Sequence, residues 1–262
     1  MTFSSTFGRT FSPTFQPKSQ AAASVSSFVP TDISGLALWL DFSDADTMFT
    51  DAGSTKVAND GDLIYQINDK SGNGYNASQG WAGYRPAYKI NIQNGLSTGY
   101  FNNDKLSLSN TLRASLDKTV TYFGVQRYDA GAQDGFGTRY YAANDFLYYT
   151  YDSTRYRFVW GTNIATEPSN TCTLQDFYIK GFKWNSPAQR VDLYNNGITS
   201  VVNGAPALNA SLAGNATSSL TLGAVNSGGI QYFAELVVYT AALSDNDMTR
   251  VVTYLNNKWA IY

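Results

Sequence analysis

The 262-residue sequence has no histidine, one cysteine and only two glutamates, Glu167 and Glu235. Without histidine it lacks the commonest general base and the commonest metal ligand, which excludes a histidine-dependent Ser or Cys triad. Because Cys172 is alone, no intrachain disulfide can form, and the fold must depend on its core. These absences favour a non-enzymatic protein with no cofactor and no metal site.

Charge and long apolar runs are scarce as well. Only 15% of the residues are charged and the net charge is −2, with no basic run to attract nucleic acid. No apolar run approaches the ~20 residues of a membrane span, and the N-terminus does not resemble a signal peptide. We therefore expect no nucleic-acid partner and no membrane partner. Export would need another route, or release by cell lysis.

Aromatic residues (15%) and glycine (22 residues) are abundant instead. Short alternating apolar segments predict strands at residues 36–40, 63–67, 120–125, 177–184, 190–194 and 220–223. The Asn195-Asn196-Gly197 sequence predicts a hairpin turn. Many short strands, frequent turns and few helices together predict an antiparallel β-sandwich.

The clearest pattern lies in residues 229–259. Residues 230–239 are apolar at almost every position, which predicts a strand covered on both faces. Ser244 then predicts a helix N-cap, with the Asp247 carboxylate reaching back to the N–H of Ser244 in a variant of the capping box. An apolar stripe follows at helical spacing: Met248, Val251, Val252, Leu255 and Trp259. This helix should lie on the sheet that contains the preceding strand.

Four segments carry a family resemblance. They read GLALWLDFSD (35–44), DKSGNGYNA (69–77), RPAY (85–88) and, at the C-terminal end, ELVVY, ALSD and YLNNKW (235–259). In this order they resemble the motifs of concanavalin A-like (laminin G-like) jelly-roll domains. The resemblance implies an all-β, antiparallel jelly-roll sandwich over residues 33–262 with one short C-terminal helix. It does not choose between lectins, glycan hydrolases and adhesive or structural modules, which share this fold. The 71–74 segment is expected to be a turn rather than a calcium loop.

Residues 1–32 form a separate predicted unit, an extended N-terminal arm and linker. Phe3, Phe7, Phe11 and Phe15 recur every four residues, each after a threonine. Gly8, Pro13 and Pro17 argue against a helix. In an extended chain the four rings lie on one side, ~13 Å apart. The arm is either a disordered tail or, as we prefer, an anchor whose phenylalanines enter pockets on another protein.

The densest aromatic region is residues 136–160. Its alternation places Tyr156, Phe158 and Trp160 on one face of a strand and Arg155, Arg157 and Val159 on the other. These aromatics either form one layer of the core or line a concave face that stacks sugar rings. For the second alternative, the candidate glycan face consists of Trp81, Tyr84, Arg139, Tyr140, Tyr148 and Arg157.

Catalysis is the weaker hypothesis, because the paired carboxylates of a jelly-roll glycosidase are missing from the sequence. Glu235 is instead expected to be structural, flanked on its own face by Phe233 and Val237 and accepting hydrogen bonds from loop backbone.

Two functions therefore compete. The first is a non-enzymatic virion protein, a bacteriophage capsid or tail decoration or fibre, docked on other virion proteins by its arm and displaying the sandwich to a glycan or host surface. The second is an extracellular glycan-binding or glycan-hydrolysing jelly-roll protein. The choice between a monomer and a homo-oligomer stays open in both.

Overall fold

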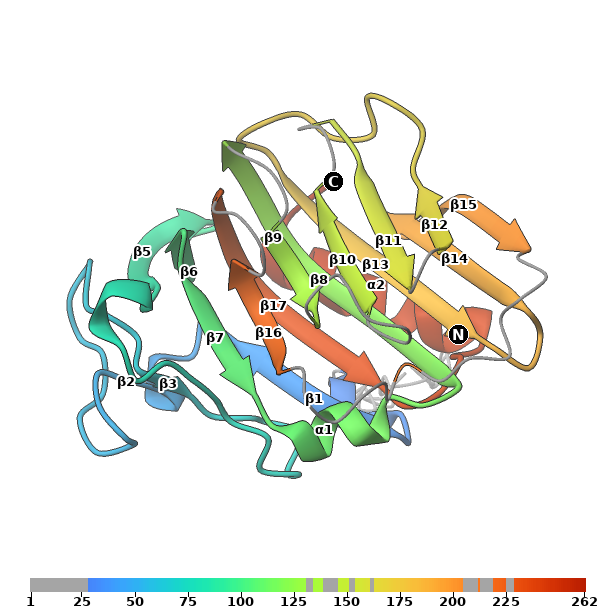
Figure 1. Ribbon diagram of the computed structural model, residues 1–262. Helices are drawn as coiled ribbons and strands as arrows, with labels where there is room; N and C mark the ends of the chain where they lie inside the picture. The colour runs from blue at the N-terminus through green and yellow to red at the C-terminus, as the bar shows by residue number, and fades with distance from the viewer. Residues whose placement is uncertain are drawn as a thin grey trace, which may run out of the picture.

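The computed structural model describes residues 28–130, 134–138, 146–150, 154–160, 163–204, 212, 219–224 and 229–262. Two antiparallel sheets face each other (Figure 1). Sheet A has the order β15 (Ile198–Gly204), β14 (Arg190–Asn195), β13 (Phe177–Asn185), β8 (Thr119–Ala130), β17 (Ile230–Tyr239), β6 (Leu96–Asn102) and β5 (Ala87–Gln93), and β1 (Leu36–Asp41) also pairs with β17. Sheet B has the order β12 (Asn163–Thr166), β11 (Tyr156–Trp160), β10 (Phe146–Thr150), β9 (Asp134–Gly137), β16 (Leu220–Ala224), β7 (Lys105–Leu108), β4 (Ala77–Ser78), β3 (Gln66–Ile67) and β2 (Met48–Phe49). The helices are α1 (Asn110–Ser115) and α2 (Asp245–Trp259), with single 3-10 turns η1 (Pro30–Asp32), η2 (Ala45–Thr47) and η3 (Ala82–Tyr84).

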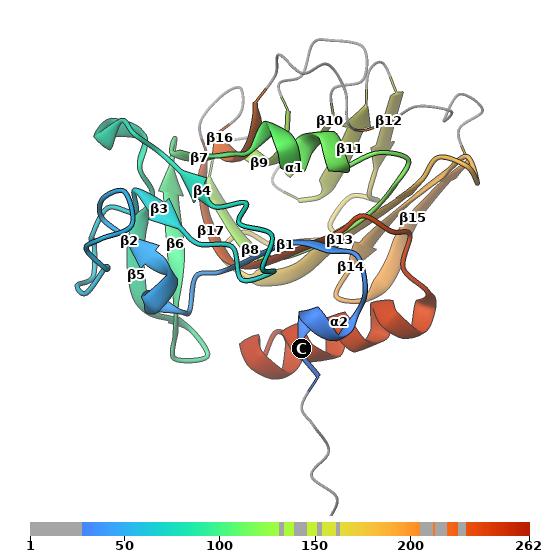
Figure 2. The ribbon, with the colours of Figure 1, turned by 90° about the horizontal axis from the view of Figure 1, so that it is seen from below.

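The molecule has three layers, seen edge-on in Figure 2, with sheet A between sheet B and α2. One apolar core fills the space between the two sheets, and a second core lies between sheet A and α2. Sheet A is therefore buried on both faces, which explains why its central strand β17 is apolar at nearly every position. The predicted all-β antiparallel sandwich with a C-terminal helix is confirmed.

Strand β17 departs from strict alternation at a bulge. Strand β8 pairs Gln126 with Phe233 and Val125 with Glu235, so Ala234 is an extra residue in β17. As a result Phe233 belongs to the core between the sheets, whereas Glu235 lies on the side of α2. The prediction that these two residues share a face is wrong, because a bulge shifts the alternation by one residue.

Helix α2 buries the face predicted from its apolar stripe: Met248, Val251, Val252, Leu255 and Trp259. Ser244 is the N-cap, and its Oγ accepts the N–H of Asp247 at 3.2 Å. The carboxylate of Asp247 accepts the Ser244 hydroxyl at 2.8 Å rather than the Ser244 backbone N–H. This differs from the predicted box because aspartate is one methylene shorter than the usual glutamate.

The strand predicted over residues 63–67 is shorter in the structure. Ile64 donates its N–H to Pro86, whereas the next residue, Tyr65, donates to Phe49. Because successive residues bond to different segments, no continuous ladder forms, and only β3 pairs regularly.

The 71–74 segment is a turn, as predicted. Gly72 and Gly74 have φ values of +89° and +75°, a region that side chains disfavour. Asn73 ties the turn to β1, since its Nδ2 donates to the carbonyl of Leu36 at 2.9 Å.

Residues before Ile33 also pack on the sandwich. The ring of Phe28 meets that of Tyr254 edge-on, with centroids 6.0 Å apart. The buried hydroxyl of Tyr239 donates to the carbonyl of Pro30 at 3.0 Å. Residues 28–32, assigned from sequence to the arm and linker, are thus in contact with the α2 layer.

Candidate functional site

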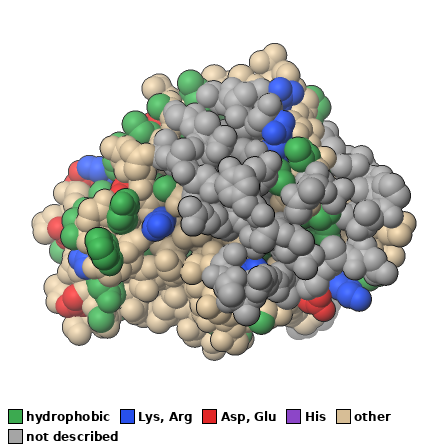
Figure 3. Space-filling view, viewed as in Figure 1, with side chains coloured by type: hydrophobic (Ala, Val, Ile, Leu, Met, Phe, Trp, Pro, Cys, Tyr) green, Lys and Arg blue, Asp and Glu red, His purple; other side chains and the backbone are tan. Residues whose placement is uncertain are grey.

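Two of the predicted glycan-binding aromatics lie together on one exposed loop. Trp81 is 76% exposed and Tyr84 is 48% exposed, at the two ends of the turn that contains η3. The N–H of Tyr84 donates to the carbonyl of Trp81 at 3.0 Å, which closes the turn and holds the two residues together. Figure 3 shows hydrophobic side chains among charged ones on the flank of the molecule beside β2, β3 and β5.

Side-chain hydrogen bonds to the backbone hold this loop in place. Arg85 donates from Nε to the carbonyl of Gln79 and from Nη2 to that of Gly80, both at 2.9 Å. The side-chain Oε1 of Gln79 in turn accepts the N–H of Trp81 at 3.1 Å. The loop is thus positioned by backbone contacts that leave both aromatic side chains exposed, so a ligand would not have to order it.

A cation lies beside the aromatic pair. The Nζ of Lys105, on β7, is 5.4 Å from the centre of the Tyr84 ring. Aromatic faces attract the C–H groups of a sugar ring, and a neighbouring ammonium can donate to hydroxyls or a carboxylate. Trp81, Tyr84 and Lys105 thus offer the chemical groups of a shallow carbohydrate site.

The residues of the predicted glycan face do not all lie close together in the structure. Arg157 is on β11, and strands β10, β9, β16 and β7 separate it from β4, which precedes the Trp81 loop. Five strand spacings correspond to about 24 Å. The Nε of Arg157 donates to the hydroxyl of Thr166 on β12 at 2.9 Å, a contact within sheet B.

Tyr148 is a correction to the predicted face. It is 1% exposed, and its ring packs against those of Tyr122, Tyr156 and Phe182 in the core between the sheets. A buried side chain cannot contact a glycan at the surface. Tyr156, Phe158 and Trp160 are likewise buried, so the core alternative is correct for these aromatics.

The remaining predicted residues lie outside the described part of the chain. These are Arg139 and Tyr140 of the glycan face, and Phe3, Phe7, Phe11 and Phe15 of the arm.

Glu235 is fully buried, accepts three side-chain hydrogen bonds and forms one ion pair. The Oε1 accepts from Trp39 Nε1 at 2.7 Å and from the Tyr254 hydroxyl at 2.8 Å. The Oε2 accepts from Trp259 Nε1 at 2.8 Å and pairs with Lys258 Nζ at 2.8 Å. The prediction of a structural, hydrogen-bonded glutamate is confirmed, but its partners are side chains rather than loop backbone.

A second carboxylate completes this cluster. Asp41 lies opposite Glu235 in the β1–β17 pair, and the ammonium of Lys258 bridges the two carboxylates. Burial raises the pKa of Glu235, and the nearby charge of Asp41 raises it further against the opposing effect of Lys258. Burial also opposes ionisation of Asp41, but Lys258, the Ser43 hydroxyl and Lys70 together outweigh it, so the pKa of Asp41 is lowered. Both carboxylates are thus committed to contacts beneath α2.

The sequence motifs thus meet in space, which sequence reasoning missed. Trp39 and Asp41 come from the GLALWLDFSD segment, Lys70 from DKSGNG, and Glu235 and Lys258 from the C-terminal segments. The available signal was that each of these segments contains a charged or hydrogen-bonding residue beside apolar strand or helix positions. Because these residues contact one another in the folded chain, the motifs that contain them have a structural role.

The other glutamate is also buried and paired, which sequence reasoning did not predict. Glu167 accepts the Nζ of Lys180 at 2.8 Å, with both side chains fully buried. It also accepts the N–H of Tyr156 and the hydroxyl of Thr171. Both glutamates of the chain therefore stabilise buried backbone or cations.

Within the described ranges, no group of three or more His, Cys, Asp or Glu residues is arranged to hold a metal ion. None of the helices described is long and apolar enough to cross a membrane.

No family model matches the sequence, and no curated protein matches it either. Among solved structures, the fold is similar to that of a Trypanosoma rangeli sialidase in complex with 2,3-difluoro-KDN. The TM-score is 0.54 at 12% identity, covering 86% of this chain and 33% of that chain. It is also similar to the botulinum neurotoxin serotype D binding domain, with a TM-score of 0.55 at 10% identity, covering 84% of this chain and 50% of that chain.

The chain thus spans a third to a half of the length of these proteins. At such low identity the likeness shows the fold alone, a β-sandwich.

Proposed function

We propose that this chain is a non-enzymatic adhesion module that binds glycan through the Trp81–Tyr84 loop. The observation that carries the proposal is the 76% exposure of Trp81 on a loop held rigid by Arg85. The exposed Trp81 ring, beside the exposed Tyr84, offers an aromatic surface on which a sugar ring can stack. The similarity of the fold to those of a sialidase and of a neurotoxin binding domain supports the same proposal.

A glycan array, followed by titration calorimetry with the best ligand, tests this proposal. Stacking on one aromatic ring is worth about 1 kcal/mol, so Trp81→Ala should weaken binding about fivefold to tenfold. Tyr84→Ala should have a smaller effect in the same direction. Ile90→Ala is the matched control, because Ile90 is a 41% exposed apolar residue on β5 outside the loop. Unchanged affinity in Trp81→Ala would remove the loop as the glycan site.

We propose further that the module is carried on a virion, held there by its N-terminal arm. This is favoured by the position of Phe28, whose ring is fixed against Tyr254 and under the Arg250 guanidinium on the outer side of α2. Figure 2 shows the described chain starting beneath α2, whereas β4, which precedes the aromatic loop, lies in the opposite layer. The arm can thus hold a partner on one side while the loop faces outward on the other. Other virion proteins are the proposed partners.

Reloading of virions assembled without this protein tests the attachment. The variant in which Phe3, Phe7, Phe11 and Phe15 are all serine should fail to load, because four buried rings would otherwise contribute roughly 6–12 kcal/mol before the cost of ordering the arm. The matched control changes Thr2, Thr6, Thr10 and Thr14 to serine, which keeps every ring. If the phenylalanine variant loads as well as the wild type, the arm is not the attachment device.

A further inference from the structure

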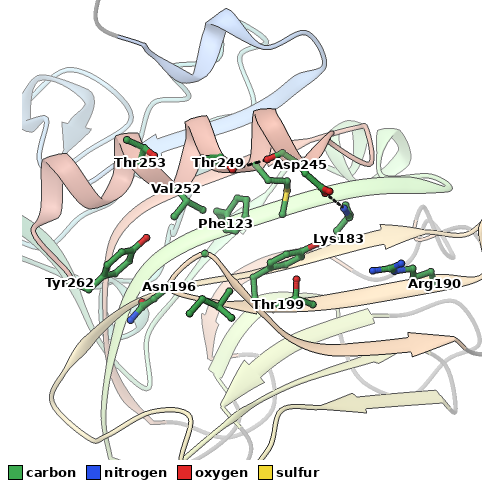
Figure 4. Close-up of a pocket in the computed structure, with 14 residues that line it drawn as sticks. Phe123, Lys183, Arg190, Asn196, Thr199, Asp245, Thr249, Val252, Thr253 and Tyr262 are labelled. Atoms are coloured by element: carbon green, nitrogen blue, oxygen red, sulfur yellow. Dashed lines mark hydrogen bonds and ion pairs between the residues drawn. The ribbon is translucent and has the colours of Figure 1, made fainter.

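A groove of about 710 Å³ lies between α2 and the β14–β15 hairpin, and neither proposed function uses it. The hairpin turn contacts the helix closely, because a Cβ on Gly197 would be 2.7 Å from Cγ1 of Val252. Figure 4 shows Val252 and Thr249 on the helix side, with Tyr262 at one end of the groove and Arg190 at the other.

The groove is bordered by two unusually exposed apolar side chains. Ile198 is 73% exposed and Tyr262 is 64% exposed, and of the large apolar side chains described only Trp81 is more exposed. Ile198 begins β15. Tyr262 is held to α2, where Asn256 Oδ1 accepts its N–H at 3.0 Å, and its hydroxyl would be 3.4 Å from a Cβ on Gly197 of the hairpin. Exposed apolar groups on both sides of a groove offer a surface that an apolar side chain can cover.

The groove also borders a free strand edge. β15 is the last strand of sheet A, and among the described strands it pairs with β14 alone. The backbone groups on its outer edge can therefore pair with an added extended segment. An occupant that combines extended backbone with apolar side chains would satisfy both features.

The N-terminal arm starts directly beside this groove. Phe28 and Val29 lie in a second depression on the other flank of α2. Thr249 and Thr253 line both depressions, so one ridge of the helix separates the beginning of the arm from the groove. A helix is only about 10 Å across, and residues 21–27 consist of small Ala and Ser residues and one Val, which can cross it closely.

The arm is long enough and has suitable side chains. Phe15 and Phe28 are thirteen positions apart, a length of chain that can span up to ~43 Å. The β-branched Thr of each Thr-Phe pair favours a strand, and its Phe offers an apolar side chain to the groove. Tethering gives the arm a local concentration on the order of millimolar, which favours the arm of the same chain over that of a second copy.

We propose that this groove binds the N-terminal arm of its own chain, as an extended segment along β15 with a phenylalanine seated between Ile198 and Val252. Docking in this way covers the phenylalanines of the arm until a partner takes them. The proposal does not depend on glycan binding by the aromatic loop.

Limited trypsin digestion of the full chain tests this proposal, because the arm contains two cleavage sites, Arg9 and Lys18. Ile198→Asp should open the groove and speed cleavage at both sites about tenfold, since cleavage follows the population of the undocked arm. Ile164→Asp is the matched control, because Ile164 is a 44% exposed apolar residue on β12 of sheet B. Its arm should be cut at the wild-type rate. Tyr262→Ser repeats the test from the other border of the groove should Ile198→Asp fail to fold.

The variant with all four arm phenylalanines changed to serine should be cut at the same fast rate as Ile198→Asp. Equal cleavage of wild type and both groove variants would overturn the proposal. Wild-type cleavage that accelerates on dilution, together with a dimer in size-exclusion chromatography, would also overturn it. That result would assign the groove to the arm of a second copy.

Discussion

The Glu235 side chain contacts residues from several of the sequence motifs. Its carboxylate accepts two indole N–H groups and a phenol, and it pairs with Lys258, all within 2.8 Å. A buried carboxylate is tolerated only when its charge and lone pairs are satisfied. Loss of any one of these partners would therefore leave part of the buried carboxylate unsatisfied.

Replacement of Glu235 by glutamine should destabilise the fold by about 3 kcal/mol, because Lys258 loses its buried counter-charge and the amide NH₂ faces donors instead of accepting from them. The free energy of unfolding from urea denaturation measures this loss. Asp245→Asn is the control, since the Asp245 side chain is fully exposed and should change stability little. Glycan affinity should be the same in both variants. A glycosidase activity that disappears in Glu235→Gln would instead overturn the non-enzymatic proposal.

Among the helices and strands, α2 takes part in three separate features of the molecule. Its apolar face closes the second core, its last turn provides Lys258 and Trp259 to the Glu235 cluster, and its outer surface separates the two depressions. One amphipathic helix thus positions the Glu235 cluster, the start of the described chain at Phe28, and the groove beside the β14–β15 hairpin.

The contribution of the α2 N-cap to the stability of the molecule should be measurable. Ser244→Ala removes the acceptor for the N–H of Asp247 and should lower the free energy of unfolding by about 1 kcal/mol. Ser54→Ala, in an exposed loop, should leave the unfolding free energy within experimental error. A loss of the same size in both variants would mean that the cap contributes nothing beyond a general effect of the substitution.

At the scale of the whole molecule, the sandwich is continuous with residues before the predicted boundary. Phe28 packs on α2, and the carbonyl of Pro30 satisfies the buried Tyr239 hydroxyl. Burial raises the pKa of Tyr239, which keeps its hydroxyl neutral and in need of an acceptor. The packed unit therefore includes residues 28–32.

Two truncated chains test which N-terminal residues belong to this packed unit. A chain of residues 28–262 should unfold cooperatively with mostly β circular dichroism, because both cores lie within it. A chain of residues 33–262 should be about 2 kcal/mol less stable, because the Tyr239 hydroxyl loses its acceptor. Chemical denaturation compares the two chains directly. Equal stability would show that the contacts of residues 28–32 are incidental, and a molten 28–262 chain would show that the arm belongs to the core.

The sequence by itself determined the features that depend on neighbours a few residues apart. Period-two alternation placed β8, β13, β14 and β17, the Asn-Gly pair placed the β14–β15 turn, and the 3.6-residue stripe identified the buried face of α2. Trp81 and Tyr84 were among the residues named for the candidate glycan face, and both are exposed.

Only the tertiary structure decided the features that depend on contacts between distant segments. Alternation could not tell whether Tyr148 faced the core or solvent, because that depends on how sheet B packs on sheet A. It could not reveal the bulge at Ala234, which is set by pairing with β8, and so it misplaced Glu235. Nor could it show that residues as far apart as Trp39 and Glu235 share a hydrogen bond. Local patterns report the conformation of a segment, whereas burial and buried charge are decided by the whole packed molecule.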